Sequence, residues 1–141
     1  MELKIKLIEN GQVPVRKHDT DAGMDCYSRG KNIDWDKGLV EYPLGFAMEI
    51  PEGYVGLLFP RSSVKDKSLQ LANCVGVIDS SYRGEVKAVF RITDFSNHNF
   101  YEVGDRVCQV IVIPYPKVEI KVVEELSSSE RGTGGFGSTG K

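Results

Sequence analysis

An aspartate and a tyrosine near the middle of the chain are well placed for chemistry. Asp79 follows an apolar run from Val75 to Ile78, and Tyr82 comes three positions later, just before Gly84. A carboxylate at the end of an apolar strand can serve as a general base, because its surroundings limit competing solvation. A tyrosine beside it can lie flat against a sugar or a base. The alternative is that Asp79 only caps the turn, as aspartate often does.

A second cluster, Pro60-Arg-Ser-Ser63, suggests phosphate binding. Pro60 ends a strand and Ser62 is a good N-cap, which together predict a short helix beginning there. The positive end of that helix and the Arg61 guanidinium would both attract an anion. The alternative is an ordinary strand-to-helix turn with a solvated arginine.

The C-terminal segment from Arg131 to Gly140 has the composition of a nucleotide clamp. It holds five of the fifteen glycines of the chain, and glycine lets backbone N–H groups approach phosphate oxygens closely. Arg131 supplies a cation, and Phe136 offers a face for a base. The alternative is a flexible tail without a binding role, which is common for Gly-rich termini.

Two further polar groups could hold a metal ion or a water molecule. Asp19, Asp21 and Asp25 surround Gly23, and their oxygens could face Mg2+ directly or through water. The alternative is a solvated acidic loop. Gln109 lies within an apolar run, where a glutamine needs partners, so it is either a structural hydrogen-bonding residue or a site residue.

Composition narrows the class of protein. The chain has 141 residues, which fits one domain, and a net charge of −2 without the basic field that nucleic-acid polymers require. It has no apolar stretch of membrane-spanning length and no signal-peptide pattern, so no membrane partner is expected. Its three cysteines are far apart, which favours buried thiols in a reducing compartment, the cytoplasm.

The elements that must position these residues are mostly strands. Apolar residues alternate, which predicts strands over Leu3–Leu7, Leu44–Ile50, Val86–Ile92 and Val118–Val122. Two nearly continuous apolar runs, Tyr54–Phe59 and Val107–Ile113, predict strands buried on both faces. Many short strands with one short helix indicate an antiparallel sandwich or barrel.

The order of these clusters along the chain is more informative about function than any single cluster. Five motifs resemble, in sequence order, those of the trimeric dUTPases: Asp21-Ala-Gly-Met-Asp25, Pro60-Arg-Ser-Ser63, Gly76-Val-Ile-Asp-Ser-Ser-Tyr-Arg-Gly84, Gly104-Asp-Arg-Val-Cys-Gln109 and Arg131-Gly-Thr-Gly-Gly-Phe-Gly-Ser-Thr-Gly140. The resemblance covers essentially the whole chain. It implies an all-β, distorted jelly-roll or barrel-like subunit with one short helix that assembles as a homotrimer. It also implies a catalytic body at 1–126 and a flexible arm at 127–141 that closes over an active site shared between subunits.

The activity implied is hydrolysis of dUTP to dUMP and pyrophosphate with Mg2+. By resemblance, Asp79 activates a water for attack at the α-phosphorus, Gln109 helps to hold that water, and Asp25 contacts the metal through its waters. Tyr82 packs beneath the deoxyribose. The remaining residues implied to bind substrate are Asn73, Gly76, Val77, Ile78 and Lys87 at uracil, Arg61, Ser62 and Ser63 at phosphates, and Arg131, Gly135, Phe136, Gly137, Ser138 and Thr139 in the arm.

The chain departs from the family pattern in a few places. Ser63 stands where the family usually has glycine, and Met24 and Cys26 replace the more usual Tyr and Leu. Two other functions are open alternatives. One is the related dCTP deaminase, in which a catalytic glutamate would be expected where this chain has Val89. The other is a nucleotide-switched regulatory module of the same fold.

Overall fold

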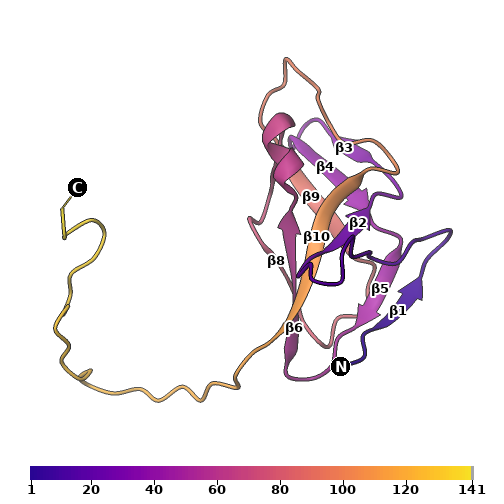
Figure 1. Cartoon of the computed structure of the whole chain (residues 1–141). Helices are drawn as coiled ribbons and strands as arrows, with labels where there is room; N and C mark the ends of the chain where they lie inside the picture. The colour runs from indigo at the N-terminus through magenta and orange to yellow at the C-terminus, as the bar shows by residue number, and fades with distance from the viewer. Residues whose placement is uncertain (141) are drawn as a thin grey trace.

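Two four-stranded antiparallel sheets and a two-stranded ribbon form the body of the chain in the computed structural model, which describes residues 1–140 (Figure 1). The first sheet has the order β2 (Met24–Tyr27), β10 (Arg106–Pro114), β6 (Tyr54–Pro60) and β8 (Gly76–Ile78). The second has the order β3 (Asn32–Asp34), β4 (Leu39–Pro43), β9 (Lys87–Ile92) and β7 (Leu69–Leu71). The ribbon pairs β1 (Lys4–Leu7) with β5 (Phe46–Glu49). The predicted all-β fold is confirmed.

The core lies between the two sheets. Strand alternation points Val40 and Tyr42 of β4, and Ala88 and Phe90 of β9, toward the interior, where all four side chains are fully buried. The first sheet contributes Leu58 from β6 and other inward side chains from β10. A packed interior of this kind holds both sheets rigid, so the loops at their edges can present polar groups in fixed positions.

Apart from Val107 and Cys108 at the start of β10, which are both fully buried, the strands β6 and β10 are buried on one face only. Gly56, Leu58 and Val110 point inward and are buried, whereas Leu57 and Ile111 on the outer face are half-buried. The prediction that both apolar runs are buried on both faces is therefore wrong for the single chain. The reason is that no layer of residues 1–140 covers the outer face of this sheet.

Other sequence-based predictions have mixed outcomes. The strands expected from Leu3, Leu44 and Val86 onward are found as β1, β5 and β9. The expectation of buried thiols holds for Cys26 and Cys108, but Cys74 is exposed in a turn. Cys74 has φ of 62°, a left-handed conformation that belongs to turns and not to strand interiors.

The single helical segment is a five-residue 3₁₀ helix, η1 (Ser62–Asp66). Arg61, not Ser62, occupies its N-cap position, and no side chain caps it, so the prediction of a serine N-cap is wrong. The Arg61 carbonyl already accepts the Val64 N–H at 3.0 Å, as a 3₁₀ turn requires. A helix this short offers little dipole, so any anion here would depend on the side chains.

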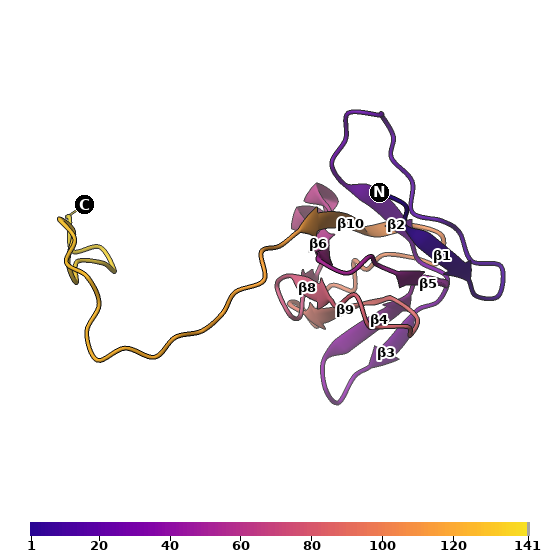
Figure 2. The same ribbon diagram turned by 90° about the horizontal axis from the view of Figure 1, so that it is seen from below.

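The chain leaves the body after β10 ends at Pro114, and the arm then runs far from the sheets in both views (Figures 1 and 2). Val118, Ile120 and Val122 are 74%, 88% and 92% exposed. The predicted strand over Val118–Val122 is therefore not formed by the chain on its own. Lys141, the last residue of the predicted arm, lies outside the described residues. No helix among residues 1–140 has the length and apolar character needed to cross a bilayer.

Candidate active site

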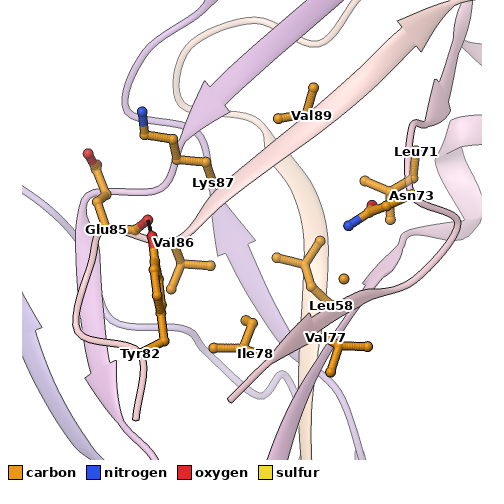
Figure 3. A pocket seen from close by; sticks show the side chains of 11 residues that line it. Leu58, Leu71, Asn73, Val77, Ile78, Tyr82, Glu85, Val86, Lys87 and Val89 are labelled. Carbon is orange, nitrogen blue, oxygen red and sulfur yellow. Dashed lines mark hydrogen bonds between the residues drawn. The ribbon is translucent and has the colours of Figure 1, made fainter. Parts of the chain in front are cut away.

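A pocket opens at the edge of the sandwich between β8 and β9, with a volume of about 200 Å³ (Figure 3). It brings together all six residues expected to contact uracil or the sugar: Asn73, Gly76, Val77, Ile78, Tyr82 and Lys87. Pockets for whole ligands usually measure about 300–1,000 Å³, so this one suits only part of a ligand. Figure 3 shows the Tyr82 ring and the Asn73 amide on opposite sides, with apolar side chains between them.

The strand that forms one wall of the pocket has a free edge. β8 is the last strand of its sheet, paired with β6 on one side only within residues 1–140. Backbone N–H and C=O groups along a free edge can form hydrogen bonds with a ligand. The inward Gly76 brings the backbone close to the wall, since a Cβ there would lie 3.1 Å from the Leu58 Cβ. The local sequence Gly-Val-Ile thus provides a backbone surface suited to a flat, polar base.

Tyr82 is held in place by its own turn. Its hydroxyl donates to the Glu85 carbonyl at 3.0 Å, and its N–H donates to the Asp79 carbonyl at 3.0 Å. Gly84 packs under the ring: a Cβ there would lie 2.4 Å from the Tyr82 hydroxyl oxygen. A larger residue here would push the ring aside, so Gly84 allows Tyr82 to keep its place at one wall of the pocket.

Asp79 is exposed at the end of β8. Among residues 1–140 its carboxylate has no hydrogen-bond partner, and only its backbone carbonyl takes part in the turn. The turn is instead secured by Arg83, which donates to the Ser80 carbonyl at 2.6 Å and to the Tyr82 carbonyl at 3.1 Å. The geometry therefore argues against Asp79 as a simple turn cap and leaves its carboxylate available for a water or a ligand.

A charged cluster lies at the other end of β6. Asp25 accepts from Arg61 Nε at 2.8 Å through one oxygen and from Arg106 at 3.2 Å through the other. Their side chains are 19%, 23% and 42% exposed. Arg61 is thus not solvated, as it would be in an ordinary strand-to-helix turn without a binding role. The neighbouring Asp21 instead accepts from the His18 N–H, as expected of a solvated acidic loop.

Gln109 belongs to this charged cluster. It lies opposite Asp25 in the β2–β10 register, and its amide donates to the Pro60 carbonyl at 3.1 Å. Its other amide atom presses against Gly23, where a Cβ would lie only 2.2 Å from the Gln109 oxygen. The glycine of the first motif thus packs directly against the glutamine of the fourth, and a larger residue there would displace the Gln109 amide.

The phosphate-binding candidates beside Arg61 have different surroundings. Ser63 is half-buried and lines a cavity of about 260 Å³ with Arg61, Lys67, Tyr101, Asp105 and Arg106. Ser62 is exposed on the first turn of η1. Arg106 and Tyr101 were not predicted as site residues. Arg106 stands inside the fourth motif and could have been suspected from its charge, whereas nothing in the local sequence marks Tyr101.

The pocket and the charged cluster are too far apart to act together within one chain. Ile78 pairs with Gly56, so Asp79 lies near Val55 of β6. Arg61 comes six positions after Val55, just beyond the other end of that strand. At about 3.3 Å per residue, roughly 20 Å separate the two ends. Gln109 lies opposite Phe59, also at the far end. One chain therefore does not bring Asp79 and Gln109 to the same water.

The arm residues lie apart from both regions (Figures 1 and 2). Phe136 is fully exposed, and Arg131 donates to the Gly134 carbonyl at 2.7 Å within the arm itself. The segment consists of successive turns, including the Ser138 N–H bonded to the Gly135 carbonyl at 3.0 Å. The structure does not bring the predicted arm residues Arg131, Gly135, Phe136, Gly137, Ser138 and Thr139 to the pocket.

Metal ligands are sparse. Residues 1–140 contain no group of three or more His, Cys, Asp or Glu side chains that could hold a metal ion. Both Asp25 oxygens already accept from guanidinium groups. The donor set therefore fits a metal held mainly by a ligand's phosphates, with a carboxylate reaching it through water, an arrangement common for Mg2+.

The pocket suits a flat, polar base, and the Arg61 guanidinium at the other end of β6 suits a phosphate. The dUTPase family profile matches residues 9–140. The chain belongs to the dUTPase family. It is 39% identical over 98% of its length to the deoxyuridine 5'-triphosphate nucleotidohydrolase of Finegoldia magna, of which it covers 99%.

Solved structures agree with this assignment. The Staphylococcus bacteriophage 80alpha dUTPase with dUPNHPP is 30% identical, with a TM-score of 0.76 and 99% coverage of both chains. A mutant dUTPase from phage phi11 of S. aureus, described with a structural Mg(II) ion, is 25% identical, with a TM-score of 0.75 and coverage of 91% of this chain and 100% of that one. The distorted jelly-roll expected from the sequence is therefore confirmed.

Proposed function

We propose that the protein hydrolyses dUTP to dUMP and pyrophosphate. The observation that carries this proposal is the pocket at the edge of β8, where the six residues expected for uracil and deoxyribose meet. The family and its deoxyuridine triphosphate nucleotidohydrolase relatives support the same activity.

Selection for a deoxyuridine nucleotide follows from the walls of the pocket. The free edge of β8 can match the donors and acceptors of uracil, with the Asn73 amide on the opposite side from Tyr82. Tyr82, held by Gly84 and its bond to Glu85, packs beneath the sugar and leaves no room for a ribose hydroxyl.

The reaction needs one activated water and charge neutralisation. Asp79 accepts a proton from the water, whose oxygen forms a bond to the α-phosphorus. The bond from that phosphorus to the bridging oxygen breaks, and pyrophosphate leaves with the electron pair. Gln109 orients the water, while Arg61, Ser62 and Ser63 bind phosphate oxygens. Such positioning and neutralisation provide most of the rate in phosphoryl chemistry.

Mg2+ fits this scheme as a substrate-bound ion. When bound, it neutralises triphosphate charge and orients the phosphates. Asp25 contacts it through water, because both carboxylate oxygens are partly engaged by arginines. The relative that is described with a structural Mg(II) ion supports a role for this metal in the family.

We propose that each active site is built from more than one copy of the chain. The separation of roughly 20 Å between Asp79 and Arg61 supports this, since neither residue can serve the other's site within one chain. The partly exposed apolar outer face of β6 and β10 offers a surface that a second copy could cover. The family resemblance makes the assembly a homotrimer.

The arm at 127–141 then closes over a neighbouring site, while the body comprises 1–126. Phe136 stacks on uracil, and Arg131, Ser138 and Thr139 bind the terminal phosphates, with Gly135 and Gly137 allowing close backbone approach. The full exposure of Phe136 supports this role, because a bulky ring in water gains most from a partner. Closure would also exclude bulk water.

Deamination of dCTP is disfavoured by the pocket itself. Val89 lines the wall where that chemistry would place a glutamate. The carboxylate that does line the pocket, Glu85, accepts from the Gly45 N–H at 3.0 Å and is thus already engaged.

Three free cysteines fit a reducing compartment, so we place the enzyme in the cytoplasm.

A pyrophosphate-release assay with Mg2+ tests the proposal. The full-length protein should act on dUTP far faster than on dTTP, dCTP or UTP. Comparable rates on UTP would refute the role of Tyr82, and ammonia release from dCTP would replace the proposed reaction with deamination.

A further inference from the structure

Ser63 is the residue at which the chain departs from the family's usual glycine, and its side chain has a defined partner. The Ser63 hydroxyl lies 2.8 Å from the Tyr101 hydroxyl. It also accepts a longer bond, 3.4 Å, from the Arg61 guanidinium. A serine oxygen can accept two hydrogen bonds and donate one, so it can serve both neighbours at once.

Tyr101 is a fixed point for this contact because the core holds it. The residue is 3% exposed. Its backbone carbonyl accepts from the buried Tyr42 hydroxyl at 2.9 Å, and its ring packs against Phe90 with centroids 6.0 Å apart. On the outer side, the Lys67 ammonium lies 5.0 Å from the ring centroid. The hydroxyl therefore reaches Ser63 from a rigid support.

Arg61 is held from two sides by this arrangement. Asp25 accepts from Nε at 2.8 Å, and Ser63 accepts from a terminal nitrogen. The remaining N–H groups of the guanidinium are left for a ligand, beside a cavity of about 260 Å³ that Lys67 and Arg106 also line. Because a long arginine side chain has many rotamers, fixing it before binding reduces the entropic cost of gripping an anion.

We propose that Tyr101 is a positioning residue that, through Ser63, orients the Arg61 guanidinium toward the phosphates of the substrate. This inference deepens the proposed function and rests on it for the identity of the substrate. Burial raises the pKa of Tyr101, so its hydroxyl stays protonated in the neutral range and keeps its bond to Ser63.

Pyrophosphate is the probe that tests this role, because it engages only the phosphate end. Tyr101→Phe keeps the ring and removes only the hydroxyl. We expect it to weaken pyrophosphate binding, measured by calorimetry on the full-length assembly, and to raise KM for dUTP by about three- to tenfold. Binding of deoxyuridine, which lacks phosphates, should be unchanged.

Two further variants separate positioning from mere packing. Ser63→Ala should reproduce the loss, and the double variant should be no worse than either single variant, since both break one link. Ser63→Thr, which keeps the hydroxyl, should retain most of the affinity. Phe46→Leu is the control: it removes buried ring volume from the core at β5 and should lower Tm without weakening pyrophosphate binding.

The outcomes are distinct. Wild-type pyrophosphate affinity in Tyr101→Phe, or losses that add in the double variant, would overturn the inference even if dUTP is hydrolysed. Absence of dUTP hydrolysis by the wild-type protein would instead overturn the proposed function, while the pyrophosphate measurements would still decide whether Tyr101 orients Arg61.

Discussion

The pocket at the edge of β8 and the charged cluster around Asp25 differ in how they are assembled. Apart from Leu58 and Leu71, the residues that line the pocket belong to one short stretch of sequence, from Asn73 to Val89, and they meet within one chain. The cluster unites three distant segments, represented by Asp25, Arg61 and Gln109, and both oxygens of its Asp25 carboxylate accept from arginines. The pocket residues proposed to face the base thus meet within one chain, whereas Asp79 and Gln109 do not.

This difference has a physical basis. The pocket is built from backbone edges and apolar side chains, which are stable without a ligand. The cluster gathers charges, and charges need compensation when they leave bulk water. Asp25 supplies that compensation by pairing with both arginines. Because one carboxylate faces two guanidinium groups, the cluster is only partly neutralised and keeps positive charge that phosphates can compensate.

The most damaging change should be Asp79→Asn. It preserves shape but removes the base, so we expect kcat to fall by about 10²- to 10⁴-fold. Binding of dUMP, measured by calorimetry, should change little, because the pocket walls remain. Asp36→Asn, at another exposed aspartate, should leave kcat unchanged. A loss of less than tenfold for Asp79→Asn would mean that the pocket end does not supply the base.

The second prediction tests whether the two regions act across chains. Asp79→Asn and Arg61→Gln should each be nearly inactive alone. After subunit exchange in an equal mixture, about a quarter of the sites should combine an intact pocket from one parent with an intact cluster from the other. Pyrophosphate release should rise accordingly. If exchange is verified by mass spectrometry and no activity returns, both regions must act within the same chain.

The contrast between the pocket and the charged cluster also explains which residues the sequence could place together. The pocket residues lie close in sequence, and two of the strands around them were predicted: alternation predicted β9, and a nearly continuous apolar run predicted β6. Residues such as Asn73 and Tyr82 were therefore placed together correctly. Short strands were missed: β2, with the sequence Met-Asp-Cys-Tyr, has only four residues, too few for a pattern to predict a strand, and it is paired with β10.

The cluster was predicted less completely, because its contacts span the whole chain. The sequence around Asp25 does not indicate that its partner is Arg106, which lies 81 positions away. Tyr101 was missed for the same reason, since only the fold brings it to Ser63. The strand expected over Val118–Val122 was wrong for one chain, because a strand needs a neighbour that residues 1–140 do not provide.

A smaller effect should follow from disturbing one wall of the pocket. In Gly84→Ala the new Cβ would meet the Tyr82 hydroxyl oxygen at 2.4 Å, so the ring must shift. We expect KM for dUTP to rise about tenfold and discrimination against UTP to weaken, with pyrophosphate binding unaffected. Gly30→Ala is the control, since its Cβ would meet only ordinary contacts at 3.5 Å from Pro43. An equal loss of pyrophosphate binding would show that the two regions are not independent.

The smallest effect is expected from Lys87→Met. The Lys87 ammonium donates to Glu41 at 3.1 Å, so the side chain of this pocket-lining residue already has a partner. KM for dUTP should stay within about twofold of wild type, because an exposed ion pair contributes little. The hydrogen bond that Lys87 donates to Glu41 raises the pKa of Lys87, so the pair persists at the usual lysine value of 10.5 and is lost only as pH rises through the raised pKa. KM for dUTP should therefore not depend on the protonation of Lys87 across the neutral pH range.

Lys37→Met, at another exposed ion pair, serves as the control. A large rise in KM for Lys87→Met alone would mean that a side-chain charge reads the base, and the pocket would then depend on charge as the cluster does.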